Sequence, residues 1–129
     1  MGIAYVDASA LVKLVVSEPD STAVFRWFIE AERIASSRIG LIETIRASSR
    51  RDHDPAHRAA VLAEVDVIEL DAAIAAVASA VAPAVLRSLD AIHLATAMVL
   101  APALDAFVTY DDRLAVAARA IGLPVMRPA

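Results

Sequence analysis

The order of apolar and polar residues predicts short buried strands that alternate with helices. Residues 3–6 form an apolar run rich in β-branched and aromatic side chains, which is typical of a buried strand. Residues 8–16 follow as a helix that is apolar on nearly all sides, so it should pack on more than one face. Asp7 stands between the two. It is either the N-cap of this helix or an acid presented at the carboxyl end of the strand, and the segment leaves both open.

The rest of the chain continues the alternation. Residues 71–81 are so rich in Ala and Val that this helix should be buried on most sides, and Ser88 is a suitable N-cap that places Asp90 in the first turn of its helix. Alternating strands and helices predict an α/β fold with a parallel sheet and right-handed crossovers. The remaining helices are predicted at 20–32, 39–51, 55–64, 88–100 and 114–121, and the remaining strands at 34–36, 65–70, 105–110 and 123–125.

Composition changes this picture by adding apolar surface. The 129 residues suit one domain, 1–129, and 59% of them are hydrophobic. The longest uncharged stretches, 72–86 and 91–104, each contain a proline and are shorter than the roughly 18–20 residues of a spanning helix. Because no signal peptide is apparent either, we expect a soluble, cytoplasmic protein with no membrane partner. The apolar surplus suggests burial against a partner or a second copy, and the aromatic face of helix 20–32 could serve either the core or a partner.

Charge and side-chain chemistry exclude several functions. The chain has no cysteine, so it lacks a thiol nucleophile and a Cys-based zinc site. The formal net charge of −4 argues against nucleic-acid binding by bulk charge. Arg46, Arg50 and Arg51 contribute to a local basic patch beside Glu43, which is either a solvated face or a phosphate-binding surface. His93, on an apolar helix, is more typical of a hydrogen-bonded core residue than of a metal ligand.

Four acids occupy corresponding positions in the predicted elements. Asp7 and Asp111 follow strands, and Glu43 and Asp90 begin helices. Strand carboxyl ends and helix amino ends share one edge of a parallel sheet, so all four can converge. Their mutual repulsion would be relieved by a hard divalent cation, Mg²⁺ or Mn²⁺, which can also activate water for attack on a phosphodiester. The spacing alone supports such a metal site only weakly.

Three segments carry a much more specific resemblance. YVDASALVKL at 5–14, LDAIHLATA at 89–97 and VTYDDRL at 108–114 look like the signature blocks of PIN-domain ribonucleases, in particular the VapC toxins of bacterial toxin–antitoxin modules. IGLIE at 39–43 matches the less distinctive block that supplies Glu43. The resemblance covers nearly the whole chain. It implies a PIN-like three-layer α/β/α fold around a central, mostly parallel sheet of four or five short strands.

The resemblance also implies a chemistry and partners. The protein would be an endoribonuclease in which Asp7, Glu43, Asp90 and Asp111 surround Mg²⁺, with Mn²⁺ as a substitute. Ser9 and Thr109 would orient the metal ligands or metal-bound water through hydrogen bonds without binding the metal themselves. Arg46, Arg50 and Arg51 would contact the RNA. The family further implies a cognate VapB-type antitoxin that covers the site, a toxin homodimer and a toxin–antitoxin hetero-oligomer.

Other functions fit the same sequence less well. A haloacid-dehalogenase-type phosphatase needs a second Asp where this chain has Ser9. That class and the response-regulator receivers also need a lysine near a later strand end, whereas the only lysine is Lys13 in the first helix. The remaining alternative is a PIN-fold RNA- or protein-binding module with little or no turnover.

Overall fold

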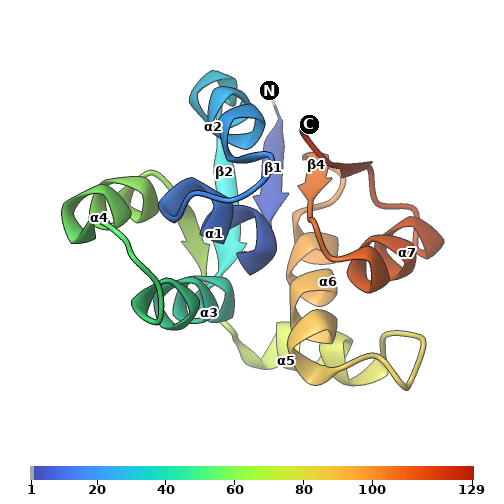
Figure 1. The fold of residues 1–129 in the computed structure, drawn as a ribbon. Helices are drawn as coiled ribbons and strands as arrows, with labels where there is room; N and C mark the ends of the chain where they lie inside the picture. Colours follow the sequence, from blue (N-terminus) through green and yellow to red (C-terminus); the bar gives the residue numbers. More distant parts are fainter. Residues whose placement is uncertain (1) are drawn as a thin grey trace.

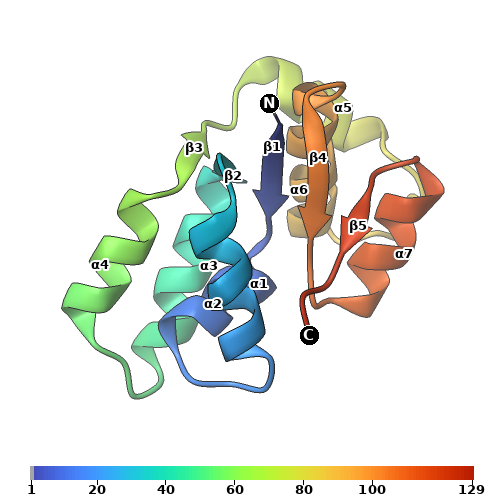
Figure 2. The same cartoon turned by 90° about the horizontal axis from the view of Figure 1, so that it is seen from above.

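A single parallel sheet forms the centre of the protein. The computed structural model describes residues 2–129. Its strands are β1 (Ile3–Val6), β2 (Ile34–Ser37), β3 (Asp66–Ile68), β4 (Leu104–Val108) and β5 (Val125–Met126). They lie in the order β3-β2-β1-β4-β5, and every neighbouring pair is parallel (Figure 2). The predicted fold class is confirmed, with five strands and no antiparallel pair among the described residues.

Helices cover both faces of the sheet (Figure 1). Strand side chains alternate between the faces, so Val6 and Val108 point to one core while Tyr5 and Phe107 point to the other. The helices are α1 (Ala8–Val15), α2 (Ser21–Glu30), α3 (Arg38–Ser49), α4 (Pro55–Ala63), α5 (Ala72–Ala80), α6 (Ser88–Leu100) and α7 (Asp112–Ala120). The first core also takes side chains from α1, α2, α3 and α4, and the second takes them from α6 and α7.

Two predictions about helices were wrong. Helix α5 is not buried on most sides, since Ile74 is its one buried residue. Alanine favours a helix through its backbone and buries little area, so an Ala-rich helix forms readily at the margin of the fold, here against α6. Ser88 is not the N-cap of α6. Arg87 holds that position, without a side-chain capping hydrogen bond, and Ser88 is the first helical residue.

Element ends differ from the prediction in smaller ways. The last strand is β5 at Val125–Met126 rather than 123–125, because Pro124 has no N–H for the ladder and contributes its carbonyl oxygen to Phe107 instead. Glu43 lies in the second turn of α3 and not at its start. Each helix within residues 2–129 is too short or too polar to cross a lipid bilayer.

Candidate active site

Asp7 leaves the carboxyl end of β1 and is both a cap and a buried acid. Its Oδ1 accepts hydrogen bonds from the backbone N–H of Ala10 at 3.1 Å and the hydroxyl of Ser9 at 2.6 Å. Its Oδ2 accepts from Thr109 Oγ1 at 2.5 Å. The residue is 3% exposed, and this burial raises the pKa of its carboxyl above the usual range, against the opposing effect of nearby His93. A carboxylate that is held by three donors and shielded from water has a fixed orientation and gains from a nearby cation.

Ser9 and Thr109 tie the ends of β1 and β4 together. Val6 is paired with Val108, so Asp7 and Thr109 leave adjacent strands at the same edge. Besides donating to Asp7, Ser9 Oγ accepts from the backbone N–H of Tyr110 at 2.7 Å, and Thr109 Oγ1 accepts from that of Asp111 at 3.0 Å. The two hydroxyls therefore hold the Asp7 carboxylate and the backbone at Asp111 in one network.

Asp90 and Asp111 are connected by an arginine. Asp111 caps α7 by accepting the N–H groups of Arg113 and Leu114 through Oδ1, which leaves Oδ2 facing Arg87 Nη2 at 3.7 Å. Arg87 also donates from Nε to Asp90 Oδ2 at 3.4 Å. The guanidinium of Arg87 thus lies between two of the predicted acids and offsets part of their charge.

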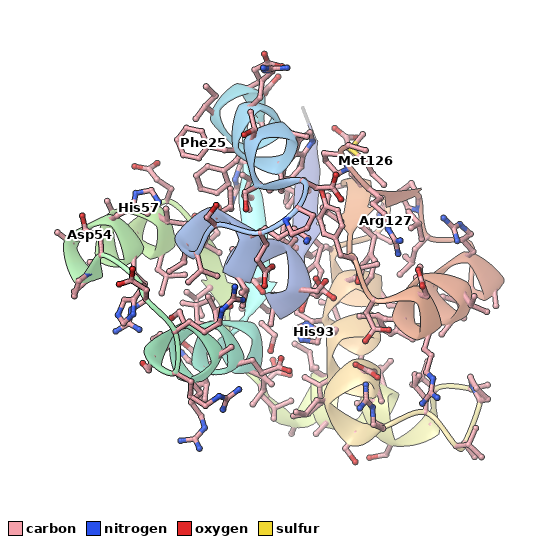
Figure 3. All side chains as sticks on the ribbon, viewed as in Figure 1. Phe25, Asp54, His57, His93, Met126 and Arg127 are labelled. Atoms are coloured by element: carbon pink, nitrogen blue, oxygen red, sulfur yellow. The ribbon has the colours of Figure 1, made fainter. Side chains whose placement is uncertain are left out.

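Glu43 enters from α3 and contacts His93 of α6. Glu43 Oε1 lies 2.7 Å from His93 Nε2, and the Glu43 side chain is 30% exposed. His93 is buried between α3 and α6 (Figure 3), and its Nδ1 is 2.6 Å from the hydroxyl of Tyr5. Glu43 also lines a shallow cavity of about 380 Å³ with Ser9 and Tyr110, so it lies near Ser9, whose hydroxyl donates to Asp7.

Asp7, Asp90 and Asp111 are thus linked through shared neighbours where the strands end, and Glu43 reaches this region through His93. Asp7 and Asp111 share Thr109, Asp90 and Asp111 share Arg87, and Glu43 contacts a residue one turn beyond Asp90. Within residues 2–129, no three His, Cys, Asp or Glu side chains are close enough to hold one metal ion as they stand. The donor set of carboxylates backed by hydroxyls nevertheless has the chemistry that hard cations such as Mg²⁺ and Mn²⁺ prefer.

The predicted substrate-binding arginines separate into two groups. Arg46 and Arg50 line a cavity of about 340 Å³ together with Glu43 and Leu89. Arg51 does not line this cavity and forms an ion pair with Glu18, which lines the cavity that Glu43 shares with Ser9 and Tyr110. Asp112, which follows Asp111, is exposed and pairs with Arg127 at 2.8 Å.

Two contributors to this edge were not predicted from the sequence. Arg87 reaches Asp90 and Asp111 because it immediately precedes α6, and its spacing of three residues from Asp90 was the available signal. Tyr5 reads as a core aromatic of β1, and nothing local indicates its hydroxyl contact with His93, 88 residues away.

Comparison with known proteins gives the family. The PIN domain family matches residues 4–120, which is most of the chain. The chain therefore belongs to the PIN domain family.

Named relatives narrow this assignment. The chain is 38% identical to ribonuclease VapC47 of Mycobacterium tuberculosis, over 96% of both chains, and 38% identical to ribonuclease VapC46, over 99% of both. It is 42% identical to ribonuclease VapC35 of the same species, over 96% of both chains. The predicted resemblance to VapC-type PIN ribonucleases, and with it the prediction of a nuclease, is confirmed.

Solved structures agree at the level of the fold. The crystal structure of M. tuberculosis VapC20, described as a sarcin–ricin loop cleaving toxin, superposes with a TM-score of 0.73 at 20% identity, covering 98% of this chain and 100% of that one. The VapBC2 complex of Rickettsia felis, bound to a promoter DNA fragment, gives a TM-score of 0.67 at 15% identity, covering 98% of this chain and 99% of the matched one.

Proposed function

We propose that this protein is a Mg²⁺-dependent endoribonuclease toxin that a cognate antitoxin neutralises, built as one domain over 1–129. The observation that carries the proposal is the linkage of Asp7, Asp90 and Asp111 at the carboxyl edge of the sheet through Thr109 and Arg87. Relatives at 38–42% identity that are named ribonucleases support the reaction class.

Each acid has a distinct part in this proposal. Asp7, Asp90 and Asp111 would hold the metal ion, and Glu43 would complete the set from α3. Ser9 and Thr109 would keep the Asp7 carboxylate oriented by donating hydrogen bonds to its two oxygens. Bound Mg²⁺ would supply an activated water and offset negative charge on the scissile phosphodiester.

The RNA would approach over α3. Arg46 and Arg50 are exposed and line the same cavity as Glu43, so they can contact phosphates that flank the cleavage site. Arg51 would first have to leave Glu18, so its contact with RNA would be weaker. These local cations would offset the formal net charge of −4, which otherwise repels RNA.

Partner binding is supported by exposed apolar side chains. Phe25 is 42% exposed and Ile29 65% exposed on α2, and they line a groove of about 480 Å³ with His57 of α4. The ring centroids of Phe25 and His57, both labelled in Figure 3, lie 6.4 Å apart. Ile42 and Leu89 form a second exposed pair beside Glu43. We assign these surfaces jointly to a VapB-type antitoxin and to a homodimer contact within a toxin–antitoxin hetero-oligomer.

Cleavage of RNA with and without Mg²⁺ tests the catalytic proposal. Asp90→Asn should abolish metal-dependent cleavage. Asp111→Asn should do the same, whereas Asp112→Asn should leave cleavage unchanged. Asp111→Asn and Asp112→Asn form a matched pair. Asn also caps helices, so both variants should keep α7, and only Asp111→Asn alters a proposed metal ligand. RNA binding that needs no metal, without any cleavage, would instead identify a binding module.

Co-expression tests the proposed partner. Expression of the chain alone should arrest the growth of a bacterial host, and expression together with the neighbouring open reading frame should relieve the arrest. Arrest that persists with the neighbour present would contradict neutralisation by that protein, and an Asp90→Asn chain should cause no arrest.

A further inference from the structure

A hydrogen-bonded chain of three side chains runs from the core to the acid edge. Tyr5 of β1 is fully buried, His93 of α6 is 2% exposed, and Glu43 of α3, whose side chain is 30% exposed, is the partly exposed end. The contacts are 2.6 Å from the Tyr5 hydroxyl to His93 Nδ1 and 2.7 Å from His93 Nε2 to Glu43 Oε1. These hydrogen bonds therefore connect β1 with Glu43. Within residues 2–129, His93 is the one side chain that forms a hydrogen bond or ion pair with Glu43.

The direction of these hydrogen bonds follows from the groups at the two ends. An ionised Glu43 carboxylate can only accept, so His93 Nε2 carries the proton and donates it. In the neutral imidazole, His93 Nδ1 then accepts from the Tyr5 hydroxyl, whose oxygen accepts in turn from the backbone N–H of Ser37 at 3.2 Å. A phenol has an ordinary pKa of about 10, so this donor is protonated at neutral pH.

Packing fixes the chain in place. The Tyr5 ring stacks on Phe107 with centroids 5.3 Å apart and the planes 9° from parallel. Gly40 lets α3 approach α6 closely, because a Cβ at that position would lie 3.1 Å from His93 Cε1 and 2.4 Å from Ser36 Oγ. No buried side-chain nitrogen or oxygen in residues 2–129 lacks a hydrogen-bond partner. The imidazole is therefore held in one orientation, with its Nε2–H aimed at Glu43.

We propose that His93 is a positioning residue that orients the Glu43 carboxylate toward the other acids, and that Tyr5 fixes the His93 tautomer for this purpose. The inference rests on the proposed function, because it assumes that Glu43 contributes to metal binding. Outer hydrogen-bond partners of a metal ligand act in this way, and their loss typically lowers metal affinity or activity by about 10–100-fold.

Calorimetric Mn²⁺ binding to the full chain tests the inference without relying on turnover. His93→Leu should weaken Mn²⁺ binding by about tenfold or more. His93→Gln, whose amide can still donate toward Glu43, should recover part of this loss. Tyr5→Phe should weaken binding by about three- to tenfold, the effect of one hydrogen bond. The matched control is His53→Leu, since His53 Nδ1 contacts the Arg51 carbonyl oxygen at 3.0 Å and is hydrogen-bonded to none of the four acids, and it should bind like the wild type.

A double-mutant cycle separates positioning from mere stability. In a Glu43→Ala background, His93→Leu should cause no further loss of Mn²⁺ affinity, because its effect passes through Glu43. A purely structural role would give additive losses. Circular dichroism verifies folding, and if His93→Leu does not fold, the same comparison is made with His93→Gln and Tyr5→Phe. Long-range ¹H–¹⁵N NMR should show His93 protonated at Nε2 in the wild type and a shifted tautomer population in Tyr5→Phe.

The outcomes distinguish the two proposals. If the wild type binds Mn²⁺ and cleaves RNA while the His93 variants bind Mn²⁺ equally well, the positioning role is refuted and the proposed function stands. A neutral His93 ring that carries its proton on Nδ1 instead of Nε2 would also refute it. If the wild type neither binds Mn²⁺ nor cleaves RNA, the proposed function fails and this inference fails with it.

Discussion

Thr109→Val tests whether the buried network around Asp7 is as strong as its contacts indicate. Thr109 is fully buried, and its hydroxyl has two functions. It donates to Asp7 Oδ2 at 2.5 Å and accepts the backbone N–H of Asp111 at 3.0 Å. Valine has nearly the same shape but neither hydrogen bond, so the variant removes the contacts without opening a large cavity.

The expected loss of stability can be worked from these two contacts. At a pH where Asp7 is ionised, the hydrogen bond from Thr109 to its carboxylate contributes about 1.5–3 kcal/mol. The Asp111 N–H loses its acceptor as well, which adds about 1 kcal/mol because it is only partly buried. We therefore expect Thr109→Val to lower the free energy of unfolding by about 3 kcal/mol, a large part of the 5–15 kcal/mol typical of a domain.

Urea denaturation in the presence of a chelator measures this loss, and Thr96→Val is the matched control. Thr96 is equally buried, but its hydroxyl donates to the Ile92 carbonyl at 2.7 Å, an oxygen within its own helix. That substitution should cost about 1 kcal/mol or less. Equal losses for the two variants, with unchanged m-values, would refute the special strength that we assign to the Asp7 network.

Three further predictions concern the same region. Arg87→Ala should tighten Mn²⁺ binding by about two- to fivefold. The exposed guanidinium pairs with Asp90 and Asp111, and a metal ion must break these pairs, which contribute about 0.2–1 kcal/mol. Calorimetry that compares Arg87→Ala with Arg87→Lys measures this change, and weaker binding by Arg87→Ala would contradict it. Gly40→Ala should lower the urea midpoint and weaken Mn²⁺ binding, because the new Cβ would clash with Ser36 and His93. The better helix propensity of Ala acts in the opposite direction, so a raised midpoint would contradict the close packing. In an absorbance titration, neither tyrosine should ionise near pH 10, because burial raises the pKa of Tyr110 to about 12 and that of Tyr5 further. The folded chain then holds protons that the unfolded chain releases, so stability should fall as the pH rises above about 10.

Local sequence patterns were sufficient for most of the fold. The apolar run before Asp7 forms β1, and Gly122, with a positive φ of 84°, follows the last turn of α7. Both features depend on residues close in the chain, so β1 and the end of α7 were predictable. The exposure of α5 was not predictable, because an Ala-rich sequence is compatible with both a buried and a marginal helix. That distinction depends on which other element packs there.

The candidate site shows the same division. Asp7, Asp90 and Asp111 stand in motifs, and their positions at strand and helix ends follow from local structure. The contacts of Glu43 with His93 and of His93 with Tyr5 join residues 50 and 88 positions apart, and no local pattern encodes such pairs. Arg87 was not predicted as a partner of the acids for a local reason. With Ser88 as the N-cap, Arg87 would lie outside the helix, whereas α6 starts one residue earlier and Arg87 is its N-cap.

The most direct test of the account is anomalous diffraction from a crystal grown with Mn²⁺. We predict a metal peak at the carboxyl edge of the sheet, within coordination distance of Asp7, Asp90 and Asp111, with Glu43 turned toward it and Arg87 displaced from the acids. A crystal at saturating Mn²⁺ with no peak there, or with its peak at the exposed Asp52 and Asp54 before α4 instead, would contradict the shared metal site.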